Sequence, residues 1–183
     1  MIAVADYQPS LLAAAHVAAA LRTIPVHSAN GLLKQWGHYL GACERPFGAE
    51  GWVLEVAAEP VAVAVSASIV STTVAGWTRH QVVELARLCS APGHRWATRP
   101  MLRLWREVAA PAWRYWPTRA AVAYSHNRRH AGDLYRWDGW QLVTTLAGSG
   151  GGGTWTTQRG DDHVATGRKT LWLWRYETAG GGV

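Results

Sequence analysis

The sequence predicts a mixed α/β fold, with one sheet and helices on both of its faces. Two observations support this: helical and strand-like segments alternate without a repeating period, and the strand-like segments are short runs rich in β-branched residues. The chain of 183 residues is 49% hydrophobic and only 16% charged, so it can bury a core. No composition shift marks a boundary, and we expect a single domain over residues 1–183.

The first half of the chain is expected to form helices followed by strands. Ser10 is a suitable N-cap for an alanine-rich helix, which Pro25 ends. Two strands rich in β-branched residues meet at a tight turn, where Glu59 precedes Pro60. The expected elements are helices at residues 10–22 and 28–41, the two strands within 51–70, and a third strand at 81–89.

The second half is expected to alternate helices and strands. Thr98 is a suitable N-cap for the third helix, and Gly139 stands at the C′ position of a short helix. A glycine-rich run at 147–153 predicts a flexible loop, and the tail 178–183 is expected to fray. The expected elements are helices at 99–109 and 129–139 and strands at 118–125, 140–146 and 169–176.

The basic residues are almost all arginines, and this bias points to an anionic partner. The formal net charge is +6, and Lys34 and Lys169 are the two lysines among 18 basic residues. A guanidinium presents a planar fork of N–H donors that matches phosphate oxygens, whereas an ammonium is a point charge. The charge therefore favours nucleic acid or a phosphorylated cofactor as partner.

The cysteines and the N-terminal segment indicate a cytoplasmic protein. Cys43 and Cys89 form no CxxC motif, which fits a reducing compartment and argues against structural zinc. The apolar run at 11–21 is too short to span a bilayer, and Asp6 precedes it instead of a basic stretch. We expect no membrane partner, and the host cytoplasm as the location if a phage encodes the protein.

One late segment carries a resemblance to a known superfamily. In AYSHNRRHAGDLYRWDGW, residues 123–140, a short helix contains Tyr135, and Gly139-Trp140 then enters the next strand. This arrangement resembles the late motif of the GNAT acyltransferases, and VVELARLCSAPG at 82–93 resembles their preceding strand and cofactor loop. The resemblance covers roughly residues 50–145. It implies a GNAT-like fold with a mostly antiparallel sheet, and acetyl-CoA or another acyl-CoA as cofactor.

Within that superfamily, the chain is more similar to the Mom-like DNA-modification proteins of phages. The run HAGDLYRWDGW at 130–140 looks like that family's GHxGxxYRxxxW, and GHYLG at 37–41 and ELARL at 84–88 also look like theirs. The family usually has Ser-Tyr-Ala-Asp where this chain has Ala-Tyr-Ser-His at 123–126. The resemblance implies transfer of an acyl or carbamoyl-type group to the exocyclic amine of a base, with adenine expected. The partner would be double-stranded phage DNA, which the modification protects from restriction.

The resemblance also implies where the cofactor binds. In GNAT enzymes the pyrophosphate of CoA lies at the N-terminus of the helix that follows the strand expected here at 81–89. The superfamily's usual glycine pattern is absent, and Arg95 and Arg99 either contact the phosphates or are solvated surface charges. The predicted cofactor-binding residues are Leu88, Cys89, Arg95, Trp96, Ala97, Thr98 and Arg99.

Tyr135 is the first catalytic candidate, because a tyrosine at this place in the superfamily lies near the CoA sulfur and can protonate the thiolate. The alternative is a tyrosine packed into the core by an amphipathic helix. Two residues could act as the base: Glu84, in a strand whose Val83 and Leu85 face the other side, and His38 on the second helix. Each has a structural alternative, Glu84 in an ion pair with an arginine and His38 as a satisfied helix residue.

Tyr124 and Ser125 also belong to the candidate site, whereas His126 and His130 raise only the question of a metal. Tyr124 and Ser125 end a strand beside the place where CoA would insert. Ser125 could hold the acyl carbonyl, polarise the acceptor or cap the next helix. His126 and His130 stand four residues apart, but no third ligand completes a recognisable motif, so we expect no metal.

Arginines beside the late motif are the predicted nucleic-acid contacts: Arg128, Arg129 and Arg136. Any one of them could be ordinary surface charge. Two alternatives to the DNA-modifying transferase stay open: a GNAT enzyme that acts on a small-molecule or protein amine, and a degenerate GNAT protein that only binds DNA. Carboxylates around the substrate would favour the first, and absence of CoA binding the second. The oligomeric state also stays open, with a homodimer as one alternative.

Overall fold

The computed structural model of the protein describes residues 18–127, 129–147 and 168–176, and its main feature is a seven-stranded sheet. The sheet is formed by β1 (Ala19–Ile24), β2 (Ala49–Val56), β3 (Glu59–Ala67), β6 (Val82–Ser90), β7 (Ala120–His126), β8 (Gln141–Ala147) and β9 (Lys169–Arg175). The strand order is β1-β2-β3-β6-β7-β9-β8. All neighbours are antiparallel except β6 and β7, which are parallel. This confirms the predicted mixed, mostly antiparallel sheet.

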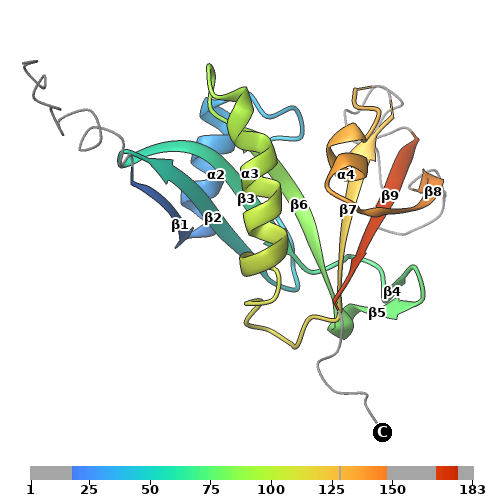
Figure 1. Ribbon diagram of the computed structural model, residues 1–183. Helices are drawn as coiled ribbons and strands as arrows, with labels where there is room; N and C mark the ends of the chain where they lie inside the picture. Colours follow the sequence, from blue (N-terminus) through green and yellow to red (C-terminus); the bar gives the residue numbers. More distant parts are fainter. Residues whose placement is uncertain (1–17, 128, 148–167, 177–183) are drawn as a thin grey trace, which may run out of the picture.

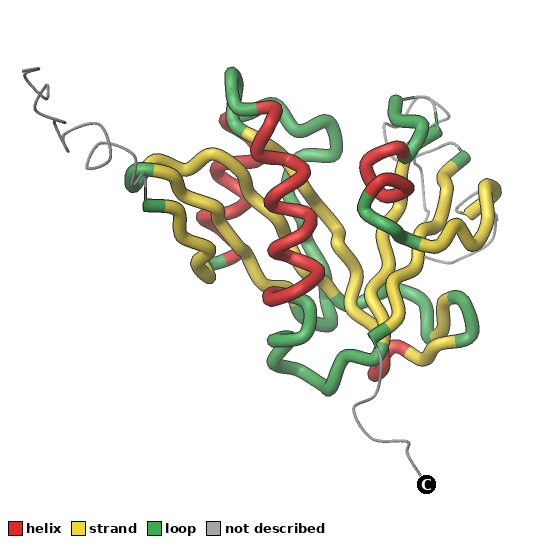
Figure 2. The backbone as a smooth tube through the Cα atoms, in the orientation of Figure 1, coloured by secondary structure: helices red, strands yellow, loops and turns green. Residues whose placement is uncertain are grey.

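Helices cover both faces of the sheet, as predicted (Figures 1 and 2). The helical segments are α2 (Val26–Gln35), η1 (Arg79–Gln81), η2 (Arg95–Ala97), α3 (Thr98–Leu104), its π-helical continuation η3 (Trp105–Ala109) and α4 (Asp133–Trp137). Alternate residues of β3 face the two sides: Val63 packs with Leu33 of α2, whereas Ala64 packs in the cluster that contains Met101 and Trp105. The sheet therefore has one apolar cluster under α2 and a larger one under α3 and η3.

The helix predicted at 10–22 is wrong where the structure describes it. Residues 10–17 lie outside the described residues, and residues 19–24 form β1, which pairs with β2 from Ala19 opposite Val56 to Ile24 opposite Gly51. The high helix propensity of alanine is a small free energy per residue. A complete antiparallel ladder with β2 outweighs it.

The second helix, α2, ends earlier than the predicted 28–41. Gly37 adopts a positive φ of 69°, which few residues other than glycine tolerate, and this conformation ends the helix at Gln35. His38 and Tyr39 therefore lie in the loop after α2, and their predicted place on the helix is wrong.

Three residues predicted to cap or turn the chain lie inside elements instead. The hairpin turn between β2 and β3 is formed by Ala57 and Ala58, whose φ values of 53° and 65° are those of a two-residue turn with both central residues left-handed. Glu59 and Pro60 are therefore the first residues of β3. Thr98 is the first residue of α3, and no side chain caps that helix.

The remaining predicted strands are confirmed close to their expected bounds, whereas the short helix predicted at 129–139 is confirmed only over Asp133–Trp137. α4 ends at Trp137 because Gly139, with a φ of 86°, stands at the predicted C′ position. A small hairpin of β4 (Thr73–Val74) and β5 (Trp77–Thr78) was not predicted. The run 148–153 and the tail 178–183 lie outside the described residues. None of the helices in the described ranges has the length and apolarity needed to cross a bilayer.

Candidate active site

The candidate site lies where the two parallel strands separate. β6 and β7 pair from Val82 opposite Ala120 to Leu85 opposite Ala123, and beyond this point each strand continues without the other. A bulge in β6 marks the separation, because Val65 pairs with Arg87 and Ser66 with Leu85, which leaves Ala86 without a partner on β3. A cavity of about 380 Å³ opens between the separated strands. We call it the splay cavity.

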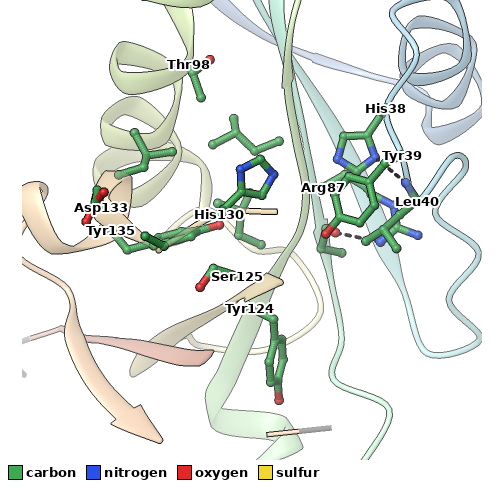
Figure 3. A pocket seen from close by; sticks show the side chains of 16 residues that line it. His38, Tyr39, Leu40, Arg87, Thr98, Tyr124, Ser125, His130, Asp133 and Tyr135 are labelled. Carbon is green, nitrogen blue, oxygen red and sulfur yellow. Dashed lines mark hydrogen bonds between the residues drawn. The ribbon is translucent and has the colours of Figure 1, made fainter. Parts of the chain in front are cut away.

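Two loops and a short helix form the walls of the splay cavity (Figure 3). His38, Tyr39 and Leu40 reach in from the loop after α2, and Tyr135 extends toward them from α4. The lining residues are His38, Tyr39, Leu40, Leu85, Ala86, Arg87, Leu88, Thr98, Tyr124, Ser125, His130, Ala131, Gly132, Asp133, Leu134 and Tyr135. The structure thus brings together three predicted site residues: Ser125 and Tyr135 from the late motif at 123–140, and His38 from a distant segment.

Tyr135 is held in the cavity by aromatic packing on two sides. Its ring stacks on Trp172 with centroids 5.7 Å apart and an interplanar angle of 23°, and it meets the edge of Trp140 at 5.5 Å. No hydrogen bond to its hydroxyl is present among the described residues. Burial, and then the charges of Tyr39 and Glu84, raise the pKa of Tyr135 well above its usual value. The phenol therefore stays protonated at neutral pH and is available there as a proton donor.

Ser125 lies on the floor of the cavity at the end of β7. Its side chain is buried, with 3% of its surface exposed, and its Oγ accepts a hydrogen bond of 2.9 Å from Nε1 of Trp172. Gly132, with a φ of 81°, passes directly over this pair: a Cβ there would lie 2.4 Å from the Trp172 ring and 3.0 Å from the Ser125 Oγ. Ser125 was predicted for the site, whereas Trp172 was not, because no local pattern marks it.

His38 owes its place to the way in which α2 ends. The N–H groups of Gly37 and His38 donate to carbonyls of the last helical turn, at 3.2 and 2.9 Å, and this turn directs the next residues toward the cavity. Nδ1 of His38 accepts a 3.3 Å hydrogen bond from the Leu40 N–H. Burial, with the charges of Arg87 and His130, lowers the pKa of His38 to about 4. At neutral pH the ring is uncharged, and Nε2 carries the hydrogen.

Arg87 fixes the loop that carries His38 and Tyr39. Its guanidinium donates to the carbonyl oxygens of Gly41 at 3.1 Å, Ala42 at 2.9 Å and its neighbour Ala86 at 2.8 Å. Arg87 was not among the predicted site residues, although a second charged residue beside Glu84 in a mainly apolar strand is a signal that could have found it. The cation and the loop carbonyls together position the histidine side of the cavity.

Glu84 and Tyr124 point away from the centre of the splay cavity. Glu84 does not line it and forms a 2.6 Å ion pair with Arg45; burial raises the pKa of Glu84, and Arg45 opposes that shift. Tyr124 lines the cavity wall, but its ring packs with Val82 and Val122 on the other side of the sheet (Figure 3). Burial, with the Glu84 charge, raises the pKa of Tyr124 to about 12. Neither residue contacts the group formed by Tyr135, Ser125 and His38.

The predicted cofactor-binding residues divide between the cavity, the core and the surface. Leu88 and Thr98 line the splay cavity, Ala97 is buried beneath α3, and Cys89 packs with the α2 cluster. Three others are exposed on the segment before α3 and in its first turn: Arg95, Trp96 and Arg99. Within the described residues, neither arginine forms an ion pair. Their charges are therefore available to an anion.

Of the three predicted nucleic-acid contacts, Arg129 and Arg136 are within the described residues, and each contacts a residue that lines the cavity. Arg129 is exposed and places its guanidinium 4.7 Å from the centre of the Tyr39 ring, a cation–π contact between the two cavity walls. Arg136 is exposed and pairs with Asp133 at 2.8 Å. Arg128 lies outside the described residues.

Comparisons with known proteins show which fold this is. Ard1 from Thermoplasma volcanium matches with a TM-score of 0.55 and 11% identity over 88% of this chain and 100% of its own. Arabidopsis thaliana NAA60, solved with acetyl-CoA, matches at 0.54 and 10%, over 86% and 98% of the two chains. A GNAT-family acetyltransferase from Desulfovibrio desulfuricans matches at 0.51 and 11%, over 86% and 99%.

No protein-family model matches the sequence, and none of the curated proteins does. The likeness lies in the tertiary structure, where the fold is that of the GNAT acetyltransferases. This confirms the fold that the late sequence motif predicted.

Proposed function

We propose that this chain is an acyl-CoA-dependent N-acyltransferase whose active site is the splay cavity. The observation that carries the proposal is the place of Tyr135: it lines a cavity between parallel strands of a GNAT fold, and its hydroxyl has no hydrogen-bond partner among the described residues. NAA60, a structural neighbour, was solved with acetyl-CoA. Acyl-CoA would supply a thioester, which is an activated acyl group.

The residues present fit an acyl-CoA. Leu88 and Thr98 give the cavity an apolar and a polar side toward α3, and the exposed Arg95 and Arg99 can meet phosphates. The Ser125 hydroxyl supplies a donor on the cavity floor. These residues would hold the group.

In the proposed reaction, Tyr135 is the general acid. The amine nitrogen forms a bond to the acyl carbon, the bond from that carbon to sulfur breaks, and the Tyr135 hydroxyl gives its proton to the sulfur. The tyrosinate that remains takes up the proton that the amine releases, directly or through water, so the proton balance closes. His38, uncharged at neutral pH, presents an Nε2–H donor from the other wall and can orient the acceptor. The proposal leaves out Glu84 and Tyr124, which face away from this group.

For the acceptor, we propose the exocyclic amine of a base in double-stranded DNA, as the resemblance to Mom-like proteins implies. Among the described lining residues, Asp133 is the single carboxylate, and Arg136 neutralises it. A cavity without a free carboxylate suits a neutral amine better than a charged one. His38 and Tyr39 stack at 5.1 Å beside the cavity, and Arg129 lies over Tyr39, so this wall offers flat and cationic groups to a base and its phosphate.

The test is a search for a modified nucleoside. The protein would be expressed in a bacterial host, the host DNA digested to nucleosides, and new species sought by mass spectrometry, with Tyr135→Phe in parallel. A new acylated nucleoside that the variant does not make supports both parts of the proposal. Calorimetric binding of acetyl-CoA without any new nucleoside would support the transferase and move the acceptor to a small-molecule or protein amine. Absence of CoA binding would contradict the transferase itself.

A further inference from the structure

Trp172, a residue of β9, contacts both of the hydroxyl-bearing residues at the centre of the splay cavity. It is 1% exposed, its Nε1–H donates to the Ser125 Oγ at 2.9 Å, and its ring stacks on Tyr135 at 5.7 Å. Gly132 closes this arrangement from above, since even a Cβ at that position would collide with the Trp172 ring. One rigid side chain thus sets the position of two groups that come from different segments.

The bond from Trp172 decides what Ser125 can do. A serine hydroxyl donates one hydrogen and accepts through its oxygen. Because the indole N–H occupies the oxygen, the hydroxyl's own hydrogen must point elsewhere, and it has no acceptor among the described residues. A buried donor without an acceptor is costly. Ser125 also lines the cavity, so a ligand oxygen there can provide the missing acceptor.

The packing around Tyr135 has the matching effect on the second hydroxyl. The ring is fixed between the face of Trp172 and the edge of Trp140, so its hydroxyl cannot swing away from the cavity. A thioester carries its carbonyl oxygen and its sulfur on the same carbon atom. Donors to these two atoms must therefore lie close together at a set spacing, which a single side chain that contacts both can impose.

We propose that Trp172 is a positioning residue that makes Ser125 the hydrogen-bond donor to the carbonyl oxygen of the acyl thioester and holds Tyr135 beside it for the sulfur. This inference rests on the proposed acyltransferase function. As the amine attacks, negative charge develops on the carbonyl oxygen, and a donor already aimed at that oxygen stabilises it without rearrangement. An accepted hydrogen bond also strengthens the donor that it polarises.

The chain contains a matched control for this arrangement. Trp105 donates its Nε1–H to the Ser66 Oγ at 2.8 Å, and both residues are fully buried. Ser66 has the same accepted bond and the same unplaced hydrogen as Ser125, but it does not line the splay cavity. Loss of either tryptophan–serine bond should affect stability, whereas loss of the Trp172 bond alone should affect thioester recognition.

The experiment compares the binding of two probes by calorimetry: acetyl-CoA, and S-ethyl-CoA, a thioether of similar size that lacks the carbonyl oxygen. The wild-type protein should bind acetyl-CoA about fivefold more tightly than S-ethyl-CoA, because one ordinary hydrogen bond to the carbonyl oxygen contributes about that factor. Ser125→Ala should abolish this preference, and Trp172→Phe, which keeps a ring to stack on Tyr135, should remove most of it. Trp105→Phe and Ser66→Ala should keep it.

The outcomes separate the inference from the function on which it rests. If the wild-type protein binds neither probe, the proposed function fails and this inference with it. If both probes bind and the preference survives in Trp172→Phe and Ser125→Ala, the function stands and the inference is overturned. If Trp172→Phe does not fold, Ser125→Ala decides alone, because a serine-to-alanine change leaves the packing of Trp172 in place.

Discussion

The same hydrogen bond, from a tryptophan N–H to a serine hydroxyl, occurs in two regions of the molecule. In the core under η3, Trp105 bonds to Ser66 at 2.8 Å, and at the splay cavity Trp172 bonds to Ser125 at 2.9 Å. All four residues are buried. In the core the bond satisfies two polar atoms that apolar packing has enclosed. At the cavity the same bond involves a serine that lines a space a ligand can enter, and the tryptophan ring also stacks on Tyr135, which lines that space as well. The comparison shows that geometry of the bond does not indicate its use, whereas its surroundings do.

The largest expected effect separates two half-buried tyrosines, Tyr135 and Tyr176. Tyr135→Phe should lower acyl transfer about 100-fold, because it removes the proton that the sulfur needs. Tyr176→Phe removes a hydroxyl that donates to the Arg106 carbonyl oxygen at 2.8 Å under α3, and it should lower stability by about 1 kcal/mol without changing turnover. Modified-nucleoside yield and thermal unfolding of both variants provide the test. Equal yields from the two variants would remove Tyr135 from the mechanism.

The second prediction compares the two serines directly. Ser66→Ala leaves the Trp105 N–H enclosed without an acceptor and should lower the free energy of unfolding by about 2 kcal/mol. Ser125→Ala should lower the free energy of unfolding by less than about 1 kcal/mol, because a water molecule in the cavity can accept a hydrogen bond from the Trp172 N–H. Urea unfolding measures both values. A larger loss for Ser125→Ala would show that its surroundings are as dry as those of Ser66.

The third prediction uses the two glycines that flank α4. Gly132 and Gly139 have φ values of 81° and 86°, so alanine at either position should cost about 1 kcal/mol of backbone strain. A Cβ at Gly139 would meet Trp174 at an ordinary 3.5 Å, whereas one at Gly132 would lie 2.4 Å from Trp172. Gly132→Ala should therefore also lower acyl transfer about tenfold, by displacing Trp172. Similar activities in the two variants would contradict the role of Trp172.

The smallest expected effect is a pH dependence of stability on the cavity side. His38 has a pKa of about 4 when folded and an ordinary value of 6.5, so the unfolded chain binds more protons below pH 6.5 and stability falls as the pH falls from there toward 4. Between about pH 7.5 and about pH 5.5 the loss from His38 should be about 1 kcal/mol. Thermal unfolding of His38→Gln should show a shallower slope than the wild type. His27→Gln, at an exposed residue of α2, should keep the wild-type slope.

The site was predictable where the chemistry is local in the sequence. Tyr135 and Gly139 belong to one short motif, and the helix that the glycine ends is the helix that carries the tyrosine. Glu84 shows the limit of this reasoning. Its alternation with Val83 and Leu85 indicated that it lies on the opposite face of the strand from these two residues, but not which of the two faces borders the cavity. Arg45, 39 residues away in the sequence, forms the ion pair with the Glu84 carboxylate.

The sequence by itself determined the fold class, the strands from β6 onward and the tyrosine-bearing helix, because period, turn residues and glycine positions act over a few neighbours. Tertiary structure alone decided that residues 19–24 pair as β1, that β6 and β7 separate after Leu85, and that Trp172 lies between Ser125 and Tyr135. Each of these depends on partners far away in the chain, where the free energy of a ladder or a packed ring exceeds local preference. The motif thus supplies Tyr135, the proposed proton donor, and the tertiary structure places it beside Trp172 and Ser125.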